Sequence, residues 1–217
     1  LTLFRQSAQL ATSVANGRAI QSGPDAIAEA AGPSCRRVRG RCLGIVGVGR
    51  IGSATALRAK AFGMRVVFYD PFVKDGTDKA LGVERVESFS ELLSIADCVS
   101  LHCNATKDNQ KMINAETLQS AKHGMFLVNT ARGELIDDEA LLQALDDGRL
   151  GGAHLDVFWN EPFVKGKSQP LGTRGAPLLE DGRLICTPHL AWYSAESREE
   201  MRKLGVAMAK KALQGEP

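Results

Sequence analysis

Short apolar runs alternate with amphipathic segments along most of this chain. Each run is nearly continuous in hydrophobicity and rich in Val, Ile, Leu or Phe, as expected for strands that are covered on both faces. The runs predict strands at residues 43–47, 65–70, 97–102, 125–130, 152–157 and 184–187.

The segments between these runs carry helix signals. Capping residues, glycine stops and helical periodicity predict a helical opening up to about residue 16 and helices at 53–62, 88–95, 115–121, 137–147 and 195–213. This alternation predicts an α/β fold with a doubly wound parallel sheet and right-handed crossovers. Residues 163–181, rich in Gly, Pro and Lys, are predicted to form a long irregular loop.

Composition and charge narrow the classes of function. The chain has 217 residues, 44% of them hydrophobic and 24% charged, which is close to globular averages. Its 27 Lys and Arg against 25 Asp and Glu leave a net charge of +2. Direct nucleic-acid binding would need a concentrated basic face, and the one short basic cluster, at 36–41, fits a solvated loop equally well. No apolar run approaches the length of a membrane span.

The cysteines and the first residues carry two further expectations. Five cysteines are an odd number and contain no C-x-x-C pair, which argues against a disulfide framework or a zinc site and for a reducing compartment. We therefore expect no metal. The chain starts without Met and inside a helical pattern, so we expect it to be a fragment of a longer protein.

A glycine motif points to a nucleotide. Gly47, Gly49 and Gly52 form G-x-G-x-x-G directly after a predicted strand and at the start of a helix, the context that this motif requires. The first glycine would allow the tight turn, the second close approach of a pyrophosphate, and the third packing of the helix on the strand. The motif predicts a dinucleotide site, with a structural glycine turn as the alternative.

An acidic residue at the end of the second predicted strand indicates which dinucleotide binds. The Asp70 carboxylate can accept hydrogen bonds from both hydroxyls of an adenine ribose and would repel a 2′-phosphate. The sequence therefore favours NAD over NADP, although the nearby Lys74 leaves NADP open.

Three later strands are each followed by residues whose side chains could bind or react with a ligand. Arg132 would present a fork of N–H donors to a carboxylate, with a surface arginine as the alternative. Asp156 could accept from a nicotinamide carboxamide, and Glu161 lies in the loop after it; a turn acid before proline is the alternative there. His189 ends the last strand.

Together these residues suggest one reaction. Ligands of open α/β sheets bind at the carboxyl ends of the strands, where Arg132 would bind the carboxylate of a 2-keto acid. His189 would donate a proton to the carbonyl oxygen while NADH delivers hydride, and Glu161 would favour the imidazolium form. A cofactor-binding domain without activity of its own is the alternative.

The motifs resemble one family. The glycine loop, Asn129-Thr-Ala-Arg-Gly133, Asp156, Glu161-Pro and Thr187-Pro-His189 resemble the D-isomer-specific 2-hydroxyacid dehydrogenases, from about residue 39 to residue 189. The resemblance implies a Rossmann NAD-binding domain at residues 1–193. It also implies a helix at 194–217 that returns to a flavodoxin-like substrate domain, truncated because its N-terminal part is absent.

Within that family the chain resembles the C-terminal-binding proteins, which are NAD-dependent transcriptional corepressors. Metabolic members usually have glycine two residues after the histidine, whereas here Ala191-Trp192-Tyr193-Ser194 follows. The resemblance implies a corepressor with slow 2-keto acid reductase activity; the alternative is a metabolic NAD-dependent D-2-hydroxyacid dehydrogenase. Residues 163–181 form a longer segment than in the corepressors, which could alter access to the pocket.

The resemblance also implies a site for each ligand. The catalytic residues would be Arg132, Glu161 and His189, and the substrate contacts Arg132 and Trp192. The residues that contact NAD would be Gly47, Val48, Gly49, Arg50, Ile51, Gly52, Asp70, Cys103, Asn104, Asn109, Thr130, Ala131, Arg132, Asp156, His189 and Trp192.

The implied partners are a small 2-keto or 2-hydroxy acid, transcription factors with Pro-x-Asp-Leu-Ser motifs and a second copy of the chain. Neither nucleic acid nor membrane is expected to bind directly. The implied location is the nucleus and cytoplasm, or the cytoplasm alone for the metabolic alternative.

Overall fold

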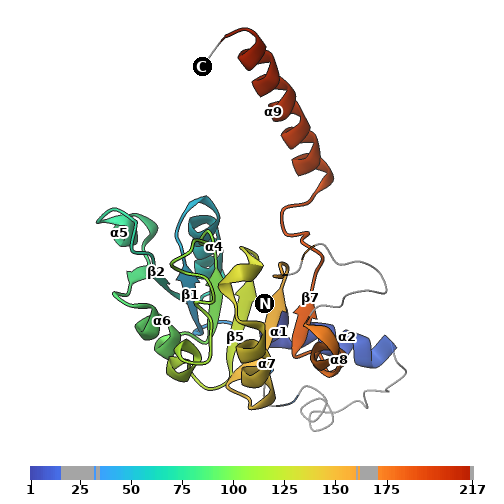
Figure 1. The fold of residues 1–217 in the computed structure, drawn as a ribbon. Helices are drawn as coiled ribbons and strands as arrows, with labels where there is room; N and C mark the ends of the chain where they lie inside the picture. Colours follow the sequence, from blue (N-terminus) through green and yellow to red (C-terminus); the bar gives the residue numbers. More distant parts are fainter. Residues whose placement is uncertain (16–31, 33–34, 160, 162–170, 216–217) are drawn as a thin grey trace. The chain divides into compact units, whose positions relative to one another are not determined.

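The computed structural model describes residues 1–15, 32, 35–159, 161 and 171–215. The chain divides into two units, Leu1–Thr187 and Pro188–Pro217, and each is described by itself (Figure 1). The predicted domain boundary after residue 193 remains a prediction. None of the helices within the described ranges is both long and apolar enough to cross a membrane.

The first unit is built on one parallel sheet. Within the described residues its seven strands have the order β3-β2-β1-β4-β5-β6-β7, and every neighbouring pair is parallel. The strands are β1 (Cys42–Val46), β2 (Arg65–Tyr69), β3 (Glu84–Arg85), β4 (Cys98–Leu101), β5 (Met125–Asn129), β6 (Leu150–Leu155) and β7 (Leu184–Cys186). The order reverses between β1 and β4, which creates a crevice outside the carboxyl ends of these strands. The predicted doubly wound sheet is confirmed.

The helical elements are mostly short. They are α1 (Thr2–Arg5), α2 (Ser7–Ala15), α4 (Arg50–Ala61), α5 (Thr77–Leu81), α6 (Phe89–Ile95), η1 (Thr117–Ser120), η2 (Gly133–Leu135), α7 (Asp138–Asp146), α8 (Gly172–Glu180) and α9 (Ala195–Leu213). The predicted N-cap of the helix at 88–95 is confirmed, since Ser88 Oγ accepts from the Glu91 N–H at 3.1 Å. The helix predicted at 115–121 is instead the shorter 3-10 turn η1, whose N-cap is Glu116, although Asn114 Oδ1 accepts from the Thr117 N–H at 2.9 Å.

The predictions of local structure were wrong or incomplete in several places. The helix α5 at Thr77–Leu81 was not predicted. The helical opening is not continuous, because Gln6 adopts a φ of +52° and separates α1 from α2. The two-residue strand β3 was missed, since Glu84-Arg85 has no apolar run. Residues 163–181 are not irregular throughout, because α8 occupies Gly172–Glu180; the part at 162–170 lies outside the described residues.

Packing explains why α8 forms despite its glycines and Pro177, which are poor helix residues. Its Leu178 side chain is buried in the core. Arg174 forms ion pairs with Glu139 and Asp146, both of α7. Contacts with other elements therefore outweigh the weak local propensity.

Helices cover both faces of the sheet. Leucines of α6 and α7 pack with β4 and β5 in one buried cluster, together with Leu178. Alanines of α4 and residues of α1 pack with β1 and β2 in the other, where Phe4 meets Phe126 edge to face at 5.0 Å. The core thus lies in two layers, one on each face of the sheet.

The second unit consists of a short segment with a turn, in which the Tyr193 N–H donates to the Leu190 carbonyl at 2.8 Å, and of α9, whose bounds agree with the prediction. Ser194 caps the helix in a reciprocal pair of hydrogen bonds with Ser197. Apolar side chains of α9, including Met201, Leu204 and Met208, are exposed. The truncated flavodoxin-like domain is not evident in the described part of the chain.

A buried carboxylate connects segments at the amino ends of the sheet strands. Asp97, with its side chain 6% exposed, accepts from Lys122 Nζ at 2.7 Å and from the Cys42 N–H at 2.9 Å. Burial alone would raise the pKa of this carboxyl, but these donors hold its pKa below the usual value. Because the folded pKa is the lower one, the carboxylate stabilises the fold above the unfolded pKa of about 3.9. That contribution is lost as pH falls through the folded pKa.

We therefore expect Asp97→Asn to lower the free energy of unfolding by about 2 kcal/mol at pH 7, with the difference from wild type shrinking below about pH 4. Urea unfolding at pH 7 and pH 3 measures both values. Asp75→Asn is the control, since the Asp75 side chain is fully exposed. A difference for Asp97→Asn that stays constant with pH would contradict this assignment.

Candidate functional site

The glycine loop joins β1 to α4 and uses its three glycines differently. Gly47 has a φ of +89°, and a Cβ there would lie 3.0 Å from the backbone of Cys103. A Cβ on Gly52 would lie 2.0 Å from the carbonyl oxygen of Gly47. Around Gly49, by contrast, no atom lies within 4 Å of the Cβ position. The outer glycines serve the chain's own packing, and the middle one leaves open space.

That open space lies at the amino end of α4, which begins at Arg50 directly after Gly49. The first N–H groups of a helix have no partner within the helix, and they form the positive end of its dipole. The first turn of α4 has no acidic side chain, while Arg50 and Ile51 are exposed. The loop therefore fits a pyrophosphate.

Asp70, at the carboxyl end of β2, is held next to this loop. Its Oδ2 accepts from the Val48 N–H and its Oδ1 from the Phe72 N–H, both at 2.9 Å. A carboxylate has acceptor capacity beyond one bond per oxygen, so it can also accept from ribose hydroxyls. The Val48 side chain itself is buried in the core, so only its backbone remains a candidate contact.

The loop after β4 lies beside the glycine loop and is closed by Asn109. The Asn109 side chain accepts from the Thr106 N–H at 2.7 Å and donates to the Asn104 carbonyl at 2.8 Å. Cys103 is half-buried, and burial raises the pKa of its thiol. His102 Nε2 lies 2.9 Å from Ser100 Oγ, and burial lowers the pKa of the His102 imidazole. Both shifts favour the uncharged forms of these side chains.

Asn129 organises the turn that carries Arg132. It is fully buried, its Oδ1 accepts from the Ala131 N–H at 3.0 Å, and its Nδ2 donates to the Arg132 carbonyl at 2.8 Å. Thr130 and Ala131 are half-buried and Arg132 is exposed. This role of Asn129 was not predicted; the signal in the sequence is a polar residue at the end of an apolar strand.

The turn after β5 packs closely against the loop after β6. A Cβ on Gly133 would lie 2.1 Å from the carbonyl carbon of Phe158 and 2.4 Å from the Trp159 nitrogen. In the second loop, Glu161 Oε1 accepts from the Phe158 N–H at 2.6 Å. The structure therefore brings together the two loops that carry Arg132 and Glu161.

Asp156 is the most buried of the predicted site residues with a charged side chain, at 2% exposure. Its N–H donates to the Asn129 carbonyl at 2.9 Å. Its Oδ1 accepts from the Thr187 hydroxyl at 2.5 Å. Thr187 belongs to the Thr187-Pro-His189 motif, but no role of its hydroxyl was predicted.

His189 and Trp192 lie in the second unit. His189 adopts a φ of +55°, which is uncommon for a residue with a side chain. The Trp192 and Tyr193 rings meet edge to face at 5.5 Å, and both are about half exposed. Since Arg132 and Glu161 belong to the first unit, the convergence of Arg132, Glu161 and His189 on one substrate remains a prediction.

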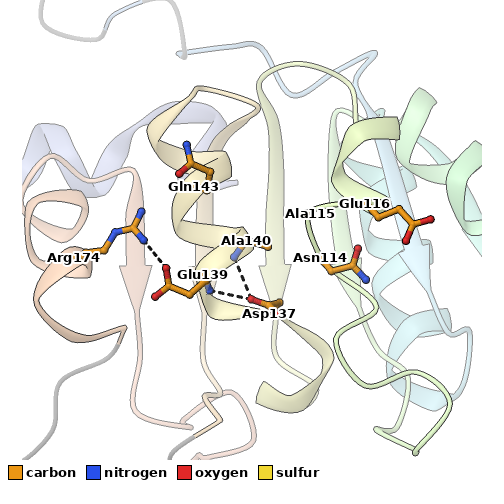
Figure 2. Close-up of a pocket in the computed structure, with 8 residues that line it drawn as sticks. All are labelled: Asn114, Ala115, Glu116, Asp137, Glu139, Ala140, Gln143 and Arg174. Atoms are coloured by element: carbon orange, nitrogen blue, oxygen red, sulfur yellow. Dashed lines mark hydrogen bonds and ion pairs between the residues drawn. The ribbon is translucent and has the colours of Figure 1, made fainter.

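A cavity of about 540 Å³ at the amino end of α7 includes none of the predicted site residues. Several of its polar groups bind one another or the backbone: Asp137 accepts from two N–H groups of α7, and Arg174 pairs with Glu139 (Figure 2). We assign no ligand to it. Its lining residues are Asn114, Ala115, Glu116, Asp137, Glu139, Ala140, Gln143 and Arg174.

Comparison with known proteins gives the family. Residues 1–191 match the D-isomer specific 2-hydroxyacid dehydrogenase NAD-binding domain. C-terminal-binding protein 1 of Caenorhabditis elegans is 41% identical over 215 residues, which is 99% of this chain and 28% of that protein. D-lactate dehydrogenase of Treponema pallidum is 42% identical over 183 residues, which is 82% of this chain and 54% of that protein.

A solved structure agrees with this assignment. D-lactate dehydrogenase from Aquifex aeolicus, complexed with NAD and lactic acid, superposes with a TM-score of 0.84 at 32% identity, over 99% of this chain and 63% of that one. The chain thus spans less than two thirds of these relatives. With a glycine loop and an acidic residue that fit the cofactor, the chain belongs to the D-isomer specific 2-hydroxyacid dehydrogenases, NAD-dependent oxidoreductases that act on CH–OH groups, and provides an NAD-binding domain.

Proposed function

We propose that the chain is the NAD(H)-binding part of a transcriptional corepressor that retains slow 2-keto acid reductase chemistry. The observation that carries this proposal is the similarity to the Caenorhabditis elegans C-terminal-binding protein over 99% of the chain. The sequence Ala191-Trp192-Tyr193-Ser194 after His189 supports it, because it resembles the corepressors at a place where metabolic members of the family usually have glycine.

The chemistry assigns a role to each candidate residue. NADH, when bound, supplies the hydride for C2 of a 2-keto acid. Arg132, on the turn that Asn129 organises, binds the substrate carboxylate. His189 donates a proton to the carbonyl oxygen, so that a 2-hydroxy acid forms, and Glu161 favours the protonated histidine. Asp156 accepts from the carboxamide of the nicotinamide.

The proposal also covers the substrate contact, the oligomeric state and the partner proteins. Trp192 contacts the substrate, two copies of the chain form a dimer, and transcription factors with Pro-x-Asp-Leu-Ser motifs bind the full-length protein in the nucleus. A pull-down with such peptides in the presence of NADH tests this, with a peptide whose Asp-Leu is replaced by Ala-Ala as control. Equal capture of the two peptides, or capture of neither, would contradict the corepressor function.

The second candidate is a metabolic D-2-hydroxyacid dehydrogenase. The 42% identity to the Treponema pallidum D-lactate dehydrogenase favours it. A turnover number on the order of 10 per second on a small 2-keto acid would support this candidate over a slow regulatory enzyme. In either case we expect His189→Ala to lower kcat by a factor of 10² or more, and an unchanged rate would refute the assignment of His189.

Asp70 is expected to decide between NADH and NADPH. Asp70→Ala removes the acceptors for the ribose hydroxyls, so NADH affinity should fall about tenfold, while NADPH affinity rises because the charge repulsion is lost. Titration of cofactor fluorescence measures both. Asp70→Asn keeps one oxygen that can accept from the loop, so it separates the effect of charge from the loss of loop support. Asp75→Ala, at an exposed position, is the control. Unchanged affinities in Asp70→Ala would contradict the prediction.

A further inference from the structure

The carboxyl end of β7 carries a hydroxyl to which the proposed function gives no role. Thr187 Oγ1 donates to Asp156 Oδ1 at 2.5 Å. That distance lies in the range of hydrogen bonds from a hydroxyl to an ionised carboxylate, which are about twice as strong as neutral ones. The acceptor is 2% exposed, so water competes little for it.

The backbone fixes both partners of this bond. The Thr187 N–H donates to the Leu155 carbonyl and the Asp156 N–H to the Asn129 carbonyl, each at 2.9 Å. Threonine is branched at Cβ, which restricts its side-chain rotation. The hydroxyl is therefore held against one carboxylate oxygen by three adjacent strand ends, those of β5, β6 and β7.

We propose that Thr187 is a positioning residue for the nicotinamide half of the cofactor, acting through Asp156. The inference rests on the proposed role of Asp156 as acceptor for the nicotinamide carboxamide. A carboxylate that rotates about its side-chain bonds presents its oxygens in many directions, whereas one anchored by a hydroxyl presents them in one. The orientation of the carboxamide, and with it the ring, then depends on a residue that does not touch the cofactor.

ADP-ribose separates this role from general stability, because it contains every part of NAD except the nicotinamide. Thr187→Val keeps the shape of the side chain and removes the donor. We expect it to weaken NADH binding about tenfold and to leave ADP-ribose binding unchanged, as measured by calorimetric titration of the full chain. Thr187→Ser should restore most of the NADH affinity.

The matched control is Thr117→Val, because the Thr117 hydroxyl also donates a hydrogen bond, to the Met112 carbonyl at 2.8 Å, but away from Asp156. It should change thermal stability without changing the ratio of NADH to ADP-ribose affinity. If Thr187→Val weakens both ligands equally, or neither, the positioning role is wrong.

Asp156→Asn tests the role of Asp156 separately from that of Thr187. If this variant leaves the ratio of NADH to ADP-ribose affinity unchanged, the proposed role of Asp156 fails and the inference fails with it. If the ratio falls in Asp156→Asn but not in Thr187→Val, only the inference about Thr187 fails.

Discussion

Gly52→Ala is expected to abolish measurable NADH binding and to destabilise the fold by about 3 kcal/mol. The added Cβ would lie 2.0 Å from the carbonyl oxygen of Gly47, so either α4 or the glycine loop has to move. Both neighbours are backbone, which cannot change rotamer to relieve the overlap. Thermal unfolding and fluorescence titration with NADH measure the two effects.

Gly49→Ala separates binding from folding in the same loop. No atom lies within 4 Å of the Cβ position, so the melting temperature should match wild type. The methyl group would occupy the space that fits a pyrophosphate, and NADH affinity should fall at least tenfold. Gly205→Ala in α9 also enters open space and is the control for both variants. Wild-type NADH affinity in Gly49→Ala would show that the pyrophosphate does not approach this loop.

Gly133→Ala is expected to produce the second large effect, a loss of about 3 kcal/mol or more in the free energy of unfolding. Its Cβ would lie 2.1 Å from the carbonyl carbon of Phe158. To make room, the turn that carries Arg132 has to separate from the loop that carries Glu161. Urea unfolding measures the loss of stability.

The functional consequence of Gly133→Ala should fall on the substrate and the nicotinamide half of the cofactor. The variant, assayed below its melting temperature, should bind ADP-ribose within a few-fold of wild type, because the glycine loop and Asp70 follow other strands. Reduction of a 2-keto acid by the full-length protein should fall with a raised KM, since Arg132 is displaced. A stability equal to that of Gly205→Ala would disprove the close contact between the loops.

Much of the fold could be predicted from local patterns. The runs at 43–47 and 125–130 are continuous in hydrophobicity because β1 and β5 are covered on both faces, and a one-dimensional pattern records that burial. Strand β3 has no such run because it lies at the edge of the sheet. The helix α8 was missed for the opposite reason: its glycines and proline signal a loop, and its stability comes from contacts with α7 and the core.

In the candidate site, too, some residues were predicted from local sequence patterns, whereas the roles of others depend on tertiary contacts. The glycine loop, Asp70 and Arg132 were recognisable because each follows a strand at a spacing that chemistry requires. Asn129, Gly133 and Thr187 were not given structural roles, because their partners are brought close only by folding. Thr187 and Asp156, for example, are 31 positions apart in the chain and share a hydrogen bond of 2.5 Å.

The order of apolar and polar residues was thus sufficient to predict the parallel sheet, and the glycine motif with Asp70 was sufficient to predict the type of cofactor, since both signals depend on neighbours in sequence. Tertiary structure alone decided which hydrogen bonds connect the ends of β5, β6 and β7 and which glycine leaves space for a ligand. The physical reason is that close packing and buried hydrogen bonds depend on distances between strands, and no local pattern contains those distances.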